Sequence, residues 1–153
     1  MIDYVGKEFS ICDGFKDNEK NQKLTGDNQF YCNFCKKLND AETYSKIIVP
    51  PYKLLINIDY GKNKKFIPNK MNFDEEIDIT NYVNFDFGTK IKYRLIGACT
   101  HFGESGLAGH YVAYCKNLEN GKWYLFNDNL CEESDKSNIY SGNPYLLLYE
   151  RIL

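Results

Sequence analysis

The chain has 153 residues, enough for one domain with a sizeable core, and a formal net charge of -2. That charge gives no reason to expect nucleic acid or an anionic membrane as a partner, and no apolar run approaches the roughly 20 residues of a membrane span. The N-terminus lacks the basic and apolar regions of a secretory signal, so we expect a cytoplasmic or nuclear protein whose six cysteines are thiols or metal ligands.

The composition favours strands over helices, because 13 residues are tyrosine and 10 are phenylalanine. The first 25 residues are poorly defined. The stretch from Ile2 to Cys12 fits either a strand or a short helix, and the polar residues 13–27 predict a loop. We expect an α+β fold dominated by antiparallel sheet, with few short helices.

Cys32 and Cys35 form a Cys-x-x-Cys pair on a predicted strand and turn. Such a pair is half of a closed zinc site, which needs four ligands, and Cys12 alone cannot complete it. We favour two idle thiols over half a metal site, and we disfavour a thioredoxin-type redox motif because no βαβ pattern follows. We therefore expect no cofactor; zinc would require a second cysteine pair from outside the chain.

Several stretches predict strands, by alternation of apolar residues or by continuous apolar runs. The run from Leu54 to Ile58 predicts a strand buried on both faces. Residues 61–70 predict a basic, exposed loop. Three glycines between His101 and His110 predict a flexible loop, which fits either a gate over a cleft or an ordinary hairpin connection. The predicted strands cover residues 46–49, 53–60, 77–79, 90–100 and 143–152.

Residues 106–128, GLAGHYVAYCKNLENGKWYLFND, carry the strongest functional signal. Two runs rich in aromatic and β-branched residues flank a polar turn, which predicts a hairpin. That hairpin would bring His110 and Asn127 together at a sheet edge, and a histidine held by an amide is how a general base is oriented. The alternative is a half-exposed polar histidine followed, further along, by a simple Asn-Asp turn.

The order and spacing of these residues resemble the histidine box of the ubiquitin-specific proteases. The resemblance rests on Gly109-His110-Tyr111, the strand after it, and Trp123-Tyr124-x-Phe126-Asn127-Asp128. This family consists of papain-like cysteine proteases that remove ubiquitin. The resemblance implies that His110 is the general base and that Asn127 is the third triad residue. Asp128 matches the following acidic position, which some members use as well.

The resemblance also suggests which residues meet the ubiquitin tail. Tyr111 and the stretch from Phe102 to Gly109 would line the channel for that glycine-rich tail, and His101 would be structural or in contact with substrate. The closing strand and the Cys32–Cys35 stretch match the palm and part of the fingers of the papain-like fold. The resemblance covers residues 26–153, only the C-terminal half of the family's catalytic domain.

No cysteine of the chain lies in the family's Asn-x-x-x-x-Cys-Tyr-type stretch, and Cys115 is expected in the core. We therefore expect residues 1–153 to form a single partial domain of a deubiquitinating cysteine protease, inactive alone. Its expected partners are ubiquitin or ubiquitinated proteins and the missing N-terminal half of the catalytic domain. The alternatives are a non-catalytic ubiquitin-binding module and a small zinc protein built on Cys32 and Cys35.

Overall fold

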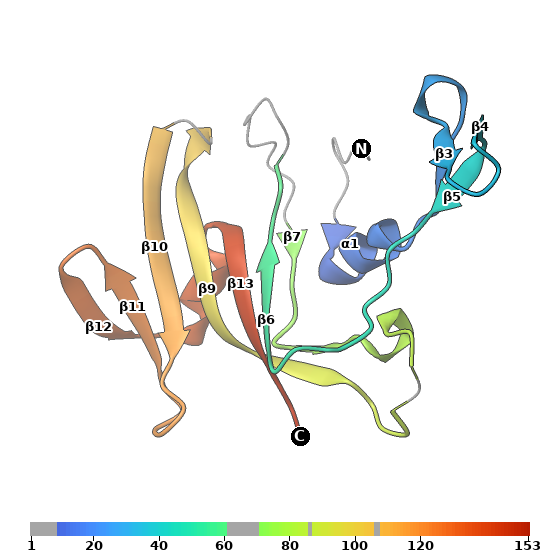
Figure 1. Ribbon diagram of the computed structural model, residues 1–153. Helices are drawn as coiled ribbons and strands as arrows, with labels where there is room; N and C mark the ends of the chain where they lie inside the picture. The colour runs from blue at the N-terminus through green and yellow to red at the C-terminus, as the bar shows by residue number, and fades with distance from the viewer. Residues whose placement is uncertain (1–8, 61–70, 86, 106–107) are drawn as a thin grey trace.

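The computed structural model describes residues 9–60, 71–85, 87–105 and 108–153 (Figure 1). Strands dominate this part of the chain, and it contains one α-helix, α1 (Ile11–Asn18). The predicted α+β fold, with mostly antiparallel sheet and few short helices, is confirmed. None of the helices in the described residues is long and apolar enough to cross a membrane.

A seven-stranded sheet forms the body of the molecule, in the order β12-β11-β10-β9-β13-β6, with β8 also pairing with β9. All of its strand pairs are antiparallel. Neighbouring antiparallel strands place the start of one beside the end of the next. The strands are β6 (Lys53–Asn57), β8 (Glu76–Asp78), β9 (Lys92–Ser105), β10 (Ala108–Lys116), β11 (Trp123–Asn127), β12 (Leu130–Ser134) and β13 (Asn143–Arg151).

The hydrophobic core covers one face of this sheet. Tyr93, Leu147 and Tyr149 are fully buried there. Short elements on this face supply further core residues, such as Met71 and Ile139. These elements are β1 (Phe9–Ser10), which pairs in parallel with β7 (Met71–Asn72), together with the 3-10 helices η2 (Thr80–Tyr82) and η3 (Lys136–Tyr140).

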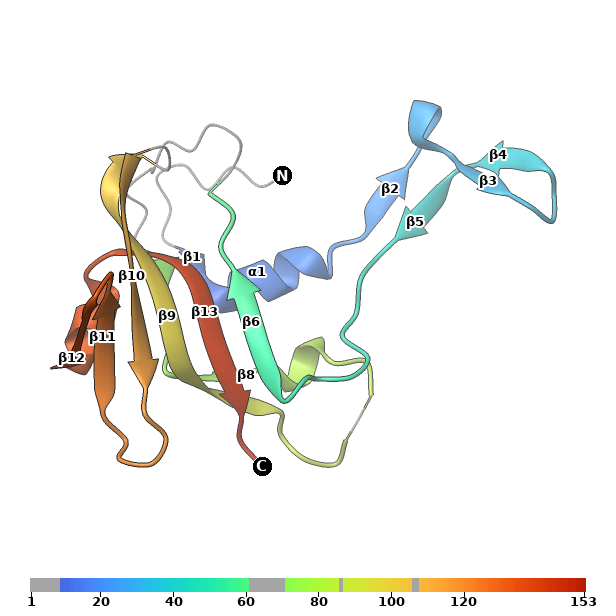
Figure 2. The same ribbon diagram turned by 60° about the vertical axis from the view of Figure 1, so that its left-hand side comes forward.

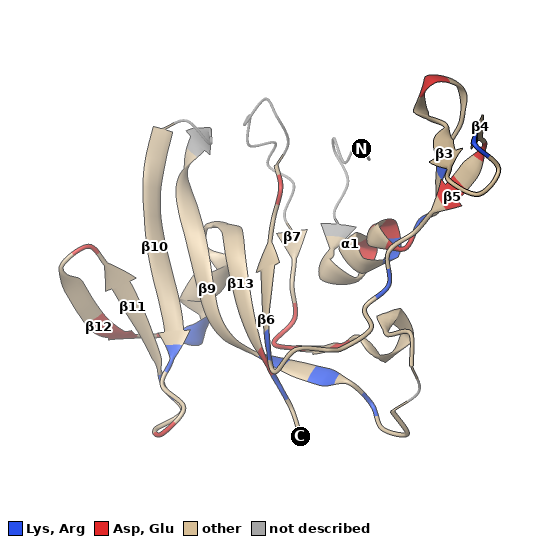
Figure 3. Ribbon diagram, in the orientation of Figure 1, with Lys and Arg blue, Asp and Glu red and all other residues tan. Residues whose placement is uncertain are grey.

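The opposite face of the sheet, which we call the outer face, stays partly or largely exposed. Cross-strand partners share a face, so the ladder registers define its members. Most of the length of β9, β10 and β13 carries no charged side chain (Figure 3). The middle of the outer face is therefore largely uncharged, and Lys53, Arg94 and Glu150 share this face near one end of the strands. Its apolar residues include Leu55, Cys99, Ala113, Cys115, Phe126, Cys131, Leu146 and Leu148.

Helix α1 occupies part of the stretch that the sequence predicts to be a loop. Ser10 and Asp13 form a capping box, in which each side chain binds the other residue's backbone N–H. Ile11 and Phe15, four residues apart, turn the same side of the helix toward the core. The capping box and this apolar pair explain why the helix forms. The polar composition of this stretch, weighed alone, predicted a loop.

Residues 22–43 form an extension that projects away from the sheet (Figures 1 and 2). It consists of two small antiparallel sheets joined end to end. The predicted strand and turn around Cys32 and Cys35 lie at its tip. Its elements are β2 (Gln22–Leu24), which pairs with β5 (Ala41–Thr43), the 3-10 helix η1 (Gly26–Asn28), and β3 (Phe30–Cys32), which pairs with β4 (Lys37–Asn39).

Two predicted strands differ from the structure. In residues 46–49 only Ile47 is paired, in an isolated bridge with Val83, and the prolines at positions 50 and 51 cannot extend that pairing because they have no N–H. Strand β6 is shorter than predicted and is not buried on both faces, since Leu55 is 60% exposed. The reason is that the described residues do not cover the outer face of β6, on which Leu55 lies.

The glycine-rich loop predicted before His110 is mostly strand. Strand β9 continues to Ser105 and β10 begins at Ala108, so the two strands remain paired almost to their ends. Residues 106–107 lie outside the described residues, as does the basic loop predicted for residues 61–70. The register of the β9–β10 ladder shifts between Ala108 and His110, next to Gly109.

Candidate active site

The β10–β11 hairpin brings His110 and Asn127 into direct contact. Ala113 lies opposite Phe126 in the ladder, so the start of β10 lies beside the end of β11, at one end of these two strands. The Nε2 atom of His110 lies 2.6 Å from the Oδ1 atom of Asn127. The predicted hairpin and the predicted proximity of these two residues are therefore both present.

This hydrogen bond determines which ring nitrogen is free. An amide oxygen can only accept a hydrogen bond. In neutral His110 the proton is therefore on Nε2, which donates a hydrogen bond to Oδ1 of Asn127. The lone pair is then on Nδ1, at the other side of the ring. Because the His110 side chain is 48% exposed, Nδ1 can accept a proton from a group that approaches from outside these strands.

Asp128 lies beside this pair but more loosely. Its carboxylate Oδ2 is 3.9 Å from Nε2 of His110, outside hydrogen-bond range, and its side chain is 79% exposed. Asp128 sits in the two-residue turn between β11 and β12 with φ of 50°, a left-handed conformation that Asp tolerates better than most residues. Asn127 is therefore the group that holds the ring, and Asp128 adds negative charge nearby.

A tight contact supports the backbone just before His110. Gly109 has φ of 155°, and a Cβ atom added there would lie 2.3 Å from Cε1 of the His101 ring. His101 is only 2% exposed, so its ring fills the space that a side chain at position 109 would need. The structure thus places His101 as a packing residue beneath Gly109, which agrees with the structural half of its predicted role.

Tyr111 lies opposite His101 in the β9–β10 ladder and packs against its ring, with the two ring centroids 4.6 Å apart. It is 45% exposed and projects from the face of β10 opposite to that of His110. Tyr145 packs edge-on against Tyr111 at 5.2 Å. Desolvation, followed by the hydrogen bond with Tyr145, raises the pKa of Tyr111. Sequence reasoning missed Tyr145, since it lies on β13, far from the histidine box in the chain.

Phe102 lies opposite His110 in the β9–β10 ladder and is 37% exposed. Its ring reaches the segment before β13, where a Cβ atom at Gly142 would lie 3.0 Å from it. Phe102 and Tyr111 are thus the predicted substrate-binding residues whose side chains remain accessible. His101 is buried against Tyr111 and Gly109, and Gly109 itself is exposed.

No cysteine lies opposite His110 in the ladders of the described residues. Cys99 is opposite Ala113, Cys115 is opposite Gly97 and Cys131 is opposite Phe126. The expectation that Cys115 lies in the core is wrong, because its side chain is exposed on the outer face. Cys32 and Cys35 sit far away on the extension. Among the described residues no group of three or more His, Cys, Asp or Glu side chains could hold a metal ion.

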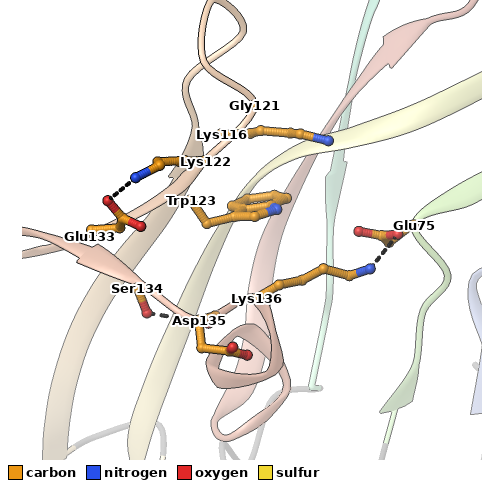
Figure 4. Close-up of a pocket in the computed structure, with 9 residues that line it drawn as sticks. All are labelled: Glu75, Lys116, Gly121, Lys122, Trp123, Glu133, Ser134, Asp135 and Lys136. Atoms are coloured by element: carbon orange, nitrogen blue, oxygen red, sulfur yellow. Dashed lines mark hydrogen bonds and ion pairs between the residues drawn. The ribbon is translucent and has the colours of Figure 1, made fainter.

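A surface hollow lies at the opposite end of β11 from the candidate pair (Figure 4). Trp123 begins the strand and forms part of its lining, but only 5% of this residue is exposed. Four charged side chains that line the hollow are already paired, Lys122 with Glu133 at 2.7 Å and Lys136 with Glu75 at 2.6 Å. These features favour a solvated surface over a site for chemistry.

Comparison with known proteins identifies related sequences along most of the chain. The family model for ubiquitin carboxyl-terminal hydrolase matches residues 12–149. Ubiquitin carboxyl-terminal hydrolase 17-like protein B of Mus musculus is 28% identical over 142 residues, which are 92% of this chain and 30% of that protein. Probable ubiquitin carboxyl-terminal hydrolase 16 of Schizosaccharomyces pombe is 30% identical over 149 residues, which are 95% of this chain and 32% of that protein. The chain thus spans about a third of the length of these relatives.

Two solved structures share the fold. One is the SAGA Ubp8/Sgf11/Sus1/Sgf73 DUB module bound to ubiquitin aldehyde, with a TM-score of 0.75 and 22% identity over 95% of this chain and 36% of that chain. The other is a variant of the same module bound to monoubiquitin, with a TM-score of 0.73 and 23% identity over 95% of this chain and 35% of that chain. At this level of identity the likeness concerns the fold alone.

Proposed function

This chain belongs to the ubiquitin carboxyl-terminal hydrolase family, and from that membership we propose that it is the base-bearing part of a deubiquitinating cysteine protease. The observation that carries the proposal is the 2.6 Å contact between His110 and Asn127. In such a protease a histidine takes the proton of a cysteine thiol, and a third residue fixes its tautomer.

In the proposed mechanism Nδ1 of His110 accepts the proton from a thiol that a separate part of the catalytic domain supplies. The thiolate attacks the carbonyl carbon of the last ubiquitin glycine, and His110 then donates the proton to the leaving lysine amine. Asn127 keeps Nε2 protonated throughout and holds the ring in place. Asp128 lies beside the ring, with Oδ2 3.9 Å from Nε2, and takes no part in holding it.

Substrate contacts follow from the exposed aromatic side chains next to His110. Phe102 and Tyr111 would line a narrow channel for the glycine-rich tail of ubiquitin, and only glycines would pass near the scissile bond. His101 and Gly109 act from behind, because their contact sets the backbone from which His110 and Tyr111 project. No cofactor takes part in this chemistry.

The nucleophile must then come from elsewhere in the catalytic domain and approach the face from which His110 and Asn127 project, while the outer face, on the opposite side of the sheet, offers a surface on which a further part of that domain can pack. This face is apolar and exposed, as Leu55 and Phe126 illustrate, and such contiguous patches mark interaction surfaces. The relatives are about three times as long as this chain, so their sequences contain ample further residues to cover it.

The direct test is hydrolysis of a ubiquitin C-terminal fluorogenic amide. The chain alone and its His110→Ala variant should both be inactive, and adding a relative's N-terminal half should produce turnover only with the unaltered chain. Asn127→Ala should lower that turnover by roughly a thousandfold, whereas the control Asn129→Ala, in the same turn, should leave it unchanged. Turnover by the chain alone that disappears in His110→Ala would place the nucleophile among its own six cysteines.

A non-catalytic ubiquitin-binding module is the second candidate. It is favoured by the registers, which place no described cysteine opposite His110. Isothermal titration of ubiquitin into the chain separates the two functions. Binding that persists while every combination with an N-terminal half stays inactive would support the module, and turnover in any combination would rule it out.

A further inference from the structure

A short row of residues crosses three strands beside the candidate pair. Phe102 on β9 lies opposite His110 on β10, so their side chains project from the same face of the sheet. His101, the residue before Phe102, lies opposite Asn143 at the start of β13. Continued by one residue, this register places Gly142 beside Phe102. The Phe102 ring therefore stands between the imidazole of His110 and a residue that has no side chain.

The end of the Phe102 ring occupies the space that a side chain at position 142 would need. A Cβ atom added to Gly142 would lie 3.0 Å from Cζ of this ring and 3.2 Å from each of its Cε atoms. Gly142 is not one of the glycines that have a positive φ, so a left-handed backbone does not explain why glycine stands here. What this glycine supplies is room, and the Phe102 ring leans over it toward β13 and away from β10.

The position of this ring decides how open His110 is. Because Nε2 of His110 donates to Asn127, the lone pair that accepts a proton is on Nδ1. The His110 side chain is 48% exposed while the Phe102 ring lies over Gly142. The χ1 angle of Phe102 has only a few staggered positions, so a side chain at position 142 would turn the ring toward the strand on its other side, where His110 lies. The ring would then cover part of the imidazole.

We propose that Gly142 is a positioning residue for His110, which acts through the Phe102 ring. By leaving room for this ring beside β13, Gly142 keeps the imidazole open to the group that gives up its proton. The importance of this opening rests on the proposed function, in which His110 is a general base. The placement of the ring does not, because it follows from the register and from the contact between Phe102 and Gly142.

The test is the rate at which diethyl pyrocarbonate modifies His110 in the full chain, followed by peptide mass mapping. The chain has two histidines, and His101 is only 2% exposed, so its protection reports that each variant is folded. Mildly alkaline pH keeps the protonation of histidine from limiting the rate. Gly142→Leu should slow the modification of His110 severalfold. Gly142→Ala should slow it less, because the ring then has to move by only a few tenths of an ångström.

A second replacement separates the effect of the ring from general damage. In Gly142→Leu combined with Phe102→Ala the ring is gone, so His110 should react as fast as in Phe102→Ala alone. The imidazole proton resonances of His110 give an independent readout, since they should shift when the ring approaches in Gly142→Leu. The control Ser141→Leu adds the same side chain at the neighbouring exposed position and should leave the rate unchanged.

Two results would overturn the proposal: an unchanged rate at His110 in Gly142→Leu while His101 stays protected, or a slow rate that persists after Phe102 is also replaced. If Gly142→Leu exposes His101 and is therefore unfolded, Gly142→Ala decides by the same comparison. These measurements need neither ubiquitin nor a nucleophile. Absence of hydrolysis in every combination with an N-terminal half would thus refute the proposed function without changing the outcome for Gly142.

Discussion

Gly109 shows how a single residue shapes the candidate site. Its Cα lies against the His101 ring, and its φ of 155° is one that residues with a side chain rarely adopt. Gly109→Ala should therefore lower the free energy of unfolding by about 2–4 kcal/mol, through both the clash and backbone strain. Urea denaturation measures this change.

The matched control is Gly121→Ala. Gly121 also has a positive φ, 74°, but a Cβ atom there would meet nothing within 4 Å. The control should cost only about 1 kcal/mol from backbone strain. Equal losses in the two variants would show that the His101 contact contributes nothing to the stability of this strand.

Sequence reasoning at the residue scale succeeded where contacts are local. His110 and Asn127 could be paired in advance, because a hairpin with a short turn determines which residues meet. Tyr145 could not be found this way, since it reaches Tyr111 from a strand that is distant in the chain. The exposure of Cys115 was also missed, because alternation along a strand separates two faces but does not say which face is covered.

At the scale of elements, Glu150 joins three adjacent strands. It lies on β13 and accepts hydrogen bonds from Lys53 on β6 and from Arg94 on β9. These hydrogen bonds lower its pKa from 4.5 to about 2. Because the pKa of Glu150 is lower in the folded chain than in the unfolded chain, its ionised carboxylate stabilises the fold above about pH 4.5. This stabilisation is lost as the pH falls toward 2.

Glu150→Gln should accordingly lower the urea midpoint near neutral pH, and the difference from the unaltered chain should shrink as the pH falls from 4.5 toward 2. The control Glu133→Gln removes a partner of Lys122 from an exposed pair, which should change the midpoint little. A difference for Glu150→Gln that stays constant across this range would mean that its charge does not stabilise the sheet.

The strands with the clearest alternation of apolar residues were the easiest to predict from the sequence. β9, β10, β11 and β13 follow from alternation and aromatic content, and all four are present. The end of β9 was mistaken for a loop because its glycines suggested flexibility. In the structure Gly103 and Gly109 instead allow two strands to approach closely. Helix α1 had a readable signal, the Ser10–Asp13 capping box, in an otherwise polar stretch.

At the scale of the whole molecule, the residues that the structure describes build a hydrophobic core on one face of the sheet and leave the other uncovered. The outer face presents Leu55 at 60% exposure and Phe126 at 44%, on strands near opposite edges of the sheet. Exposed apolar surface of this extent favours association, because burying it removes it from water. The chain alone should therefore self-associate, with a sedimentation coefficient that rises with concentration.

The double variant Leu55→Ser with Phe126→Ser should sediment more nearly as a monomer, since it makes both ends of the outer face polar. Phe34→Ser is the control, because Phe34 is 97% exposed but lies on the extension. If the outer face is where the rest of the catalytic domain docks, an added N-terminal half should suppress self-association of the unaltered chain and should bind the double variant less tightly. A monodisperse monomer at high concentration would argue against both uses of this surface.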